Sequence, residues 1–145
     1  MANDTTNQVG LTLFTQGGVV YENIDTAKTL AAADIGIVQR VIADGITITL
    51  PATVVGMTYT IMNGGAPAST SVGAGTGSDA SVAVTVAPNA SDQINGLNFT
   101  GADNKAAINT KATAKVGDFI TLVGDGTAGV GWNVLYARGI WARQA

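Results

Sequence analysis

Carboxylates are the groups of this sequence best suited to acid–base chemistry, because its 145 residues include ten Asp and Glu but no histidine and no cysteine. Two carboxylates about 5–9.5 Å apart can hydrolyse a glycosidic bond. The candidates, however, lie near Gly, Asn or Gln in turn-like segments, where an aspartate usually binds backbone N–H groups. They are Asp34, Asp44, Asp92, Asp103, Asp118 and Asp125. We therefore predict no catalytic residue and no enzymatic activity.

Metal and cofactor chemistry is limited by the same composition. Without histidine or cysteine the chain has no imidazole base or imidazole metal ligand, no thiolate nucleophile and no structural zinc site. It also has no D-x-[DN]-x-[DN]-G calcium loop, which leaves a lone calcium ion between loops as the one metal-binding alternative. We predict no metal and no cofactor.

One segment, Gly124 to Gly129, matches the dinucleotide-binding pattern G-x-G-x-x-G. That pattern binds pyrophosphate because its glycines lead into the N-terminus of a helix. Here residues 130–134 (VGWNV) follow it and have the pattern of a strand, so we interpret the glycines as a hairpin loop. The glycine run at 73–77 lacks the Lys and Ser/Thr of a phosphate-binding loop, and it predicts a flexible loop instead.

The charge of the chain limits its partners. The net charge is −3, only 12% of the residues are charged, and the seven basic residues are scattered. Such a chain has no electrostatic attraction to a phosphate backbone. No apolar run approaches the roughly 18 residues of a membrane span, and the start lacks the pattern of a secretory signal. We predict neither a nucleic-acid partner nor a membrane partner.

Aromatic residues near the C-terminus are candidates for partner contacts. Trp132 and Tyr136 alternate in step with Val134, which predicts that both lie in the core. Trp141 follows this strand pattern and stands near Arg143. Trp and Arg are enriched at protein interfaces, so we predict that Trp141 and Arg143 contact a partner. Stacking of these aromatics on a sugar is the alternative interpretation.

Alternation of apolar with small or polar residues predicts strands along most of the chain. The expected strands are 37–43, 46–50, 57–61, 82–86, 108–116, 119–123 and 132–136. The pair Asp44-Gly45 predicts a hairpin between the first two, and 57–61 extends it into a meander. Two segments stay ambiguous: 26–33 has mild helical character, and a helix over 102–112 competes with the strand that follows.

Together these elements predict an all-β fold, a compact antiparallel β-sandwich or open β-barrel of about seven or eight short strands. We expect a single β-domain over residues 21–145, with a flexible Gly/Ala/Ser-rich loop at 63–80. Residues 1–20 are expected to form an N-terminal arm. Its apolar residues Leu11, Leu13 and Phe14 predict either an edge strand of the same sheet or a tether that adds a strand to a partner.

Three stretches of the chain, at 29–65, 84–97 and 115–141, resemble β-rich modules of tailed-bacteriophage virions, above all head decoration, or cement, proteins. They share an Asp-x-Gly turn, a T-L-P-A strand end, a G-x-x-Y-T-I-x-N strand, a V-x-P segment and a closing Gly-Trp-x-V strand. The matching positions are Asp34 with Gly36, Thr49 to Ala52, Gly56 with Tyr59 to Asn63, Val86 with Pro88, and Gly131 with Trp132 and Val134. These positions are scaffold residues, so no functional residue carries over.

The resemblance implies a structural virion protein on the capsid exterior, made in the host cytoplasm. Its partners would be the phage major capsid protein and further copies of itself, in a homotrimer as the first expectation and a dimer as the second. The alternative is a tail-fibre or receptor-binding module that recognises host cell-surface glycan through Trp141, Tyr21 or the 63–80 loop.

Overall fold

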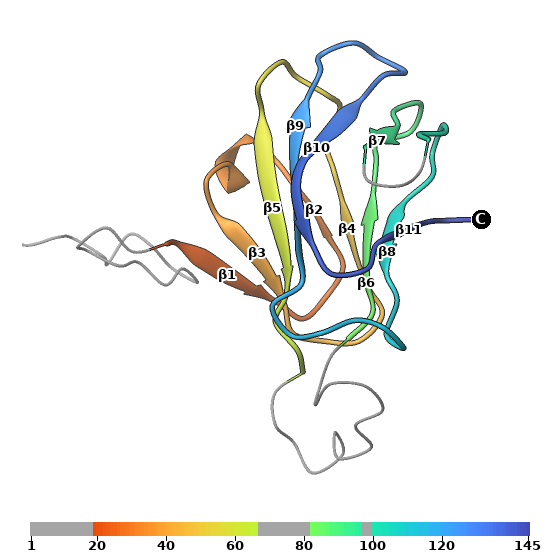
Figure 1. Cartoon of the computed structure of the whole chain (residues 1–145). Coiled ribbons are helices and arrows are strands. Elements are labelled where there is room, and N and C mark those ends of the chain that lie inside the picture. The colour runs from red at the N-terminus through yellow and green to blue at the C-terminus, as the bar shows by residue number, and fades with distance from the viewer. Residues whose placement is uncertain (1–18, 67–81, 97–99) are drawn as a thin grey trace, which may run out of the picture.

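The computed structural model describes residues 19–66, 82–96 and 100–145, and Figure 1 shows their arrangement. Six strands form one sheet, here called sheet A, in the order β1-β3-β5-β9-β10-β7, and five form sheet B, in the order β11-β8-β6-β4-β2. The strands of sheet A are β1 (Tyr21–Ile24), β3 (Val38–Val41), β5 (Thr58–Asn63), β9 (Phe119–Gly124), β10 (Trp132–Arg138) and β7 (Ile94–Asn95). Those of sheet B are β11 (Ala142–Arg143), β8 (Ala107–Asn109), β6 (Val84–Ala87), β4 (Ile46–Thr49) and β2 (Lys28–Thr29).

The predicted all-β class and the two-sheet sandwich are confirmed, but both sheets are mixed where antiparallel sheets were expected. The pairs β1/β3, β3/β5, β2/β4, β4/β6 and β7/β10 are parallel. The described part of the chain holds eleven strands, more than expected, because several have only two or three residues.

The chain reaches this pairing by crossing from one sheet to the other after nearly every strand. From β1 to β6 it alternates between sheet A and sheet B, so each strand lies beside the strand two steps away in sequence (Figure 1). The expected hairpin at Asp44-Gly45 is therefore wrong: Gly45 does turn the chain, with a φ of 74°, but the turn leads from sheet A to sheet B. The expected meander of 46–50 with 57–61 is wrong for the same reason, because these strands belong to opposite sheets.

Three local expectations also change. The strand expected at 108–116 ends at Asn109, and Thr110 then accepts the N–H groups of Thr113 and Ala114 in a turn. A helix over 102–112 is equally wrong, since β8 lies within it. The segment 26–33 forms the short strand β2 and the start of the 3₁₀ turn η1 (Ala32–Asp34).

The outer limits of the expected domain shift as well. Residues 1–18, with Leu11, Leu13 and Phe14, and residues 67–81 of the expected flexible loop lie outside the described residues. Of the expected arm, Val20 accepts the backbone N–H of Val38, so it already belongs to the edge of sheet A. Of the expected loop, Asn63 is the buried last residue of β5.

The hydrophobic core fills the space between the inner faces of the two sheets. Trp132 is fully buried there and its ring centre lies 5.5 Å from that of Tyr59. The aliphatic residues around them include Ile48, Val84 and Val86 from sheet B and Ile61, Ile120 and Leu122 from sheet A. Among the described residues, Trp132 Nε1 is the one buried side-chain nitrogen or oxygen without a hydrogen-bond partner.

A chain of buried hydrogen bonds links the two sheets beside this core. Asn63 at the end of β5 donates its amide to the Val82 carbonyl at 2.7 Å and to Oδ1 of Asn109 in β8 at 2.9 Å. The Asn109 amide in turn donates to Asp118 Oδ2 and to the Ile140 carbonyl, both at 3.0 Å. We refer to Asn63, Asn109 and Asp118 as the inter-sheet amide network.

Two glycines next to this network provide a matched test of its packing. Gly139 and Gly117 both have φ near 90°, so alanine is strained at either position by about 1–2 kcal/mol. A Cβ at Gly139 would lie 2.1 Å from Asp118 Cγ, whereas a Cβ at Gly117 would meet nothing within 4 Å. Gly139→Ala should therefore lower the free energy of unfolding by about 2 kcal/mol more than Gly117→Ala, as measured by urea denaturation. Equal losses would show that Asp118 is not held against Gly139.

Candidate functional site

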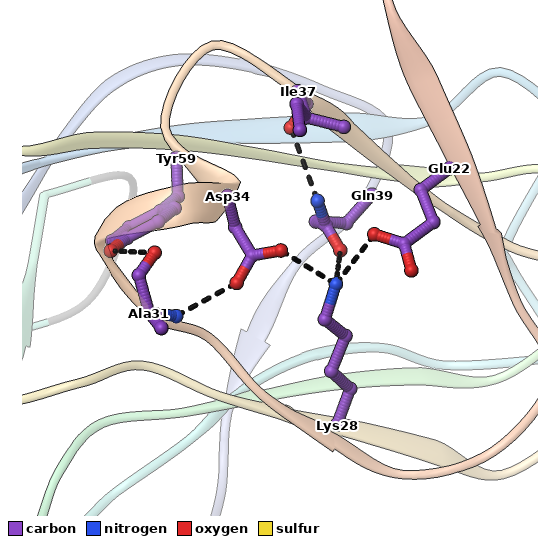
Figure 2. Close-up of polar contacts among 7 residues, drawn as sticks. All are labelled: Glu22, Lys28, Ala31, Asp34, Ile37, Gln39 and Tyr59. Carbon is purple, nitrogen blue, oxygen red and sulfur yellow. Dashed lines mark hydrogen bonds and ion pairs between the residues drawn. The ribbon is translucent and has the colours of Figure 1, made fainter. Parts of the chain in front are cut away.

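The densest group of charged side chains in the described structure surrounds Lys28 of β2 (Figure 2). Its Nζ donates to Glu22 Oε2 at 2.6 Å, to Asp34 Oδ1 at 2.6 Å and to Gln39 Oε1 at 2.9 Å. Glu22 lies on β1, Asp34 on η1 and Gln39 on β3, so one ammonium group joins four elements and both sheets. We call these four residues the Lys28 cluster.

The acceptors around Lys28 are themselves held in place. Asp34 Oδ2 accepts the backbone N–H of Ala31 at 2.8 Å, and Gln39 Nε2 donates to the Ile37 carbonyl at 3.4 Å. The hydroxyl of Tyr59 donates to the Ala31 carbonyl at 2.9 Å, as Figure 2 also shows. The turn at 31–34 is thereby held against β2 through Asp34 and Lys28, and against the core through Ala31 and Tyr59.

Electrostatics keep the Lys28 ammonium charged. Partial burial disfavours the charge, but the hydrogen bonds that the ammonium donates to Asp34 and Glu22 outweigh it and hold the pKa of Lys28 above its ordinary value. Burial, together with the nearby charge of Asp34, raises the pKa of the Tyr59 hydroxyl. At neutral pH Lys28 is thus a protonated amine with no lone pair for nucleophilic attack, and its chemical role is to neutralise two carboxylates between the sheets.

The Lys28 cluster was missed by the sequence reasoning. Its residues are separated by irregular spacings, and Lys28 stands in the stretch that had mild helical character. The one available signal was the presence of the only glutamate, Glu22, within a few residues of an isolated lysine.

The aspartates were interpreted as turn residues that bind backbone N–H groups, and four of the six do so. Asp34 binds the N–H of Ala31, Asp44 that of Ala83, Asp92 that of Thr53, and Asp118 that of Lys115. Asp103 accepts instead from the side chain of Gln93. No three acidic side chains among the described residues are grouped so that they could hold a metal ion.

The glycine-rich segment 124–129 lies at the end of β9 and in the connection to β10. These two strands pair antiparallel, so the interpretation as a hairpin loop is confirmed. The loop is closed by backbone hydrogen bonds from Asp125 N–H to the Gly131 carbonyl and from Gly131 N–H to the Thr127 carbonyl.

The aromatic candidates divide between core and surface. Burial of Trp132 is confirmed, but burial of Tyr136 is wrong, because its side chain is 68% exposed. A β-bulge between Val134 and Tyr136 inserts Leu135, which reverses the alternation and turns Tyr136 outward. The parity argument failed because it assumed a regular strand.

The residues predicted to contact a partner lie in different settings. Trp141 is only 7% exposed, packs in the core and donates its Nε1–H to the Arg138 carbonyl at 3.0 Å, so little of its indole can reach a partner. Arg143 is exposed on β11 and donates to the Thr100 carbonyl at 2.9 Å. Leu11, Leu13 and Phe14 belong to the part of the chain that the structure does not describe.

The outer side of sheet A carries two rows of side chains across five strands, defined by the pairing of β1, β3, β5, β9 and β10. The first row is Tyr21, Val38, Thr60, Thr121 and Tyr136. The second row is Asn23, Arg40, Met62, Phe119 and Arg138. We call these ten residues the outer face of sheet A.

The outer side of sheet B has a different composition. Its rows across β4, β6, β8 and β11 contain Thr47, Thr85, Ile108 and Ala142. A second row contains Thr29, Thr49 and Ala87. These seven residues, which we call the outer face of sheet B, include no aromatic and no charged residue. The aromatic and charged side chains lie on the outer face of sheet A instead.

The Lys28 cluster makes a prediction about alkaline stability. The pKa of Lys28 is higher in the folded state than its ordinary value of 10.5. The stabilisation by the ammonium charge is therefore complete below about pH 10.5 and is lost as the pH rises through the folded-state pKa. Lys28→Met leaves Glu22 and Asp34 without their cation and should cost about 2 kcal/mol at pH 7. The difference in Tm between wild type and Lys28→Met should then narrow above pH 10.5, as followed by circular dichroism.

Lys111→Met is the matched control, because Lys111 pairs with Asp44 while about half of each side chain is exposed. It should cost less than about 1 kcal/mol. A Tm difference for Lys28→Met that stays constant with pH would contradict the proposed role of the ammonium charge.

Comparison with known proteins finds no protein-family model and no curated protein that matches the chain. Among the described residues no helix is long and apolar enough to span a bilayer.

Proposed function

We propose that this chain is a structural protein of a phage virion, which binds the outer surface of the capsid as an oligomer and stabilises the lattice of the major capsid protein. The proposal is carried by the motifs in residues 29–65, 84–97 and 115–141, which resemble those of head decoration proteins. These stretches supply β3, β4, β5, β6, β7, β9 and β10, which make up most of the sandwich.

The placement of polar groups supports a structural role. Four turn aspartates bind backbone N–H groups, and the Lys28 ammonium is surrounded by three acceptors of the same chain. Polar side chains that already have hydrogen-bond partners within the chain make the fold rigid, and a partner would then bind the outer faces of the sheets. Such a body suits a protein that acts by covering another surface.

The mechanism is linkage between binding and assembly. A protein that binds the assembled lattice, and not the free capsid subunits, adds its binding free energy to the assembled state alone. Each bound copy then shifts the equilibrium toward the closed shell. Contacts among copies would add to this effect, with trimers at local three-fold axes expected before dimers at two-folds.

A tail-fibre or receptor-binding module is the second candidate, and one observation favours it. Sugars stack on exposed aromatic rings, and Tyr136 is mostly exposed on β10. In that case the protein would be found in the tail, and Tyr136 would contact glycan.

Electron microscopy of particles from phage deleted for this gene tests the proposal. We expect complete heads that lack surface density and lose their DNA at a lower temperature than wild-type heads, because the bound copies no longer stabilise the lattice. Addition of purified protein should restore both properties. Unchanged heads with density missing from the tail would overturn the proposal and favour the second candidate.

The N-terminal segment provides a further prediction. Residues 19–66, 82–96 and 100–145 form both sheets and the core between them, so deletion of residues 1–18 should leave the Tm within a few degrees of the full-length value. If Leu11, Leu13 and Phe14 contact a partner as predicted, the deletion should weaken binding to deleted heads at least tenfold. A truncated chain that fails to fold would instead place these residues in the sandwich itself.

A further inference from the structure

We infer that the outer face of sheet A is the docking surface of this protein, and that it binds a carboxylate-bearing surface of a second protein. The inference rests on the proposed function, in which that second protein is the major capsid protein. It adds which side of the sandwich meets the shell and what chemistry the shell must present there.

The composition of this face is that of an interface. Interfaces are enriched in aromatic residues, Met and Arg, and depleted in Lys, Glu, Asp, Ser and Ala. The ten residues of the outer face of sheet A include two tyrosines, one phenylalanine, one methionine and two arginines, and none of the depleted types. The outer face of sheet B, with threonine, alanine and one isoleucine, has no such enrichment.

One edge of the face is preorganised around Arg40. Its guanidinium donates to Asn23 Oδ1 at 3.0 Å and to the Gly64 carbonyl at 3.1 Å, and it lies 6.0 Å from the centre of the Tyr21 ring. A side chain that is already ordered loses little conformational entropy when a partner binds. None of these contacts uses a carboxylate, and among the described residues no ion pair neutralises the charge of Arg40.

Beside Arg40 the surface is hollowed. Val19, Tyr21, Val38, Arg40 and Met62 line a depression of about 420 Å³. An apolar depression next to a fixed cation can receive an apolar side chain of a partner while a neighbouring carboxylate pairs with the guanidinium. Val19, at the border of this depression, is also the first described residue.

The opposite edge of the face is formed by Tyr136 and Arg138, which the bulge in β10 turns outward. Both side chains are exposed. Tyr and Arg are the residue types that most often dominate binding energy when they are buried at an interface. The face thus has an Arg and a Tyr at each edge, with Val38, Met62 and Phe119 between them.

Charge decides between the possible occupants. The face carries two positive charges and no acidic side chain, although the whole chain has a net charge of −3. The same face of a second copy would therefore oppose arginine to arginine with no carboxylate to pair them. A surface of another protein that offers carboxylates at the spacing of Arg40 and Arg138 is complementary to it.

Binding of purified variants to heads from the deletion phage tests the inference, with dissociation constants measured by co-sedimentation. The variants are Arg138→Glu and Tyr136→Ala, whose exposed side chains allow substitution without loss of the fold. The matched control is Lys115→Glu, which makes the same charge change at an exposed position outside the ten residues of the outer face of sheet A. Tm values within a few degrees of wild type establish that each variant is folded.

We expect Arg138→Glu and Tyr136→Ala to bind at least tenfold more weakly, while Lys115→Glu stays within about twofold of wild type. Wild-type binding should also weaken with added salt, and less steeply in Arg138→Glu, because a screened ion pair has been removed. Wild-type affinity of both face variants would overturn the docking face and leave the proposed function standing. A loss of binding confined to Lys115→Glu would have the same two consequences. No binding of the wild-type protein to deleted heads would overturn the proposed function, and the docking inference with it.

Discussion

The sandwich depends on hydrogen bonds that pass between its two sheets. Hydrophobic burial draws the sheets together but has no direction, so it does not fix how one sheet lies on the other. The inter-sheet amide network does so, because Asn63 of sheet A and Asn109 of sheet B each satisfy their amides only in one relative position. The Lys28 cluster acts in the same way between β2 of sheet B and β1 and β3 of sheet A. Loss of either would leave buried polar groups unpaired, and such groups cost more free energy than a pair contributes.

These links also explain why the polar side chains near turns offer little chemistry. Asp118 binds an amide and a backbone N–H, and Asp34 binds an ammonium and a backbone N–H. Each carboxylate therefore serves the folded chain itself. The two outer faces of the sandwich, in contrast, differ sharply in composition although both belong to regular sheets.

Most of the longer strands could be predicted from the sequence, but β1, β2, β7 and β11 could not, and neither could the pairing of the strands. Alternation over 46–50, 57–61 and 119–123 depends only on each strand having one buried side, and these strands are present. Alternation does not say which strand lies next to which, and the assumption that neighbours in sequence pair gave a hairpin and a meander that do not exist. The error at Tyr136 is of a related kind, because a single inserted residue reverses the side on which every later residue lies. The Lys28 cluster and the rows of the outer face of sheet A follow from pairing, so the sequence alone could not predict them. Trp141 was expected at the surface because it follows the strand pattern, yet the turn at Gly139 returns it to the core.

The crossing of the chain between sheets has a consequence for how the protein folds. Partners in the parallel pairs are far apart in sequence: Tyr21 lies beside Val38, and Ile46 beside Val84. Each such pair must close a long loop before its contacts form, and chains dominated by such pairings fold slowly. The exception is the β9–β10 hairpin, which needs only the short loop of residues 125–131. The most local folding nucleus therefore lies in this hairpin, which follows the parallel strands in the sequence, and β5 gains its antiparallel neighbour only when β9 pairs with it.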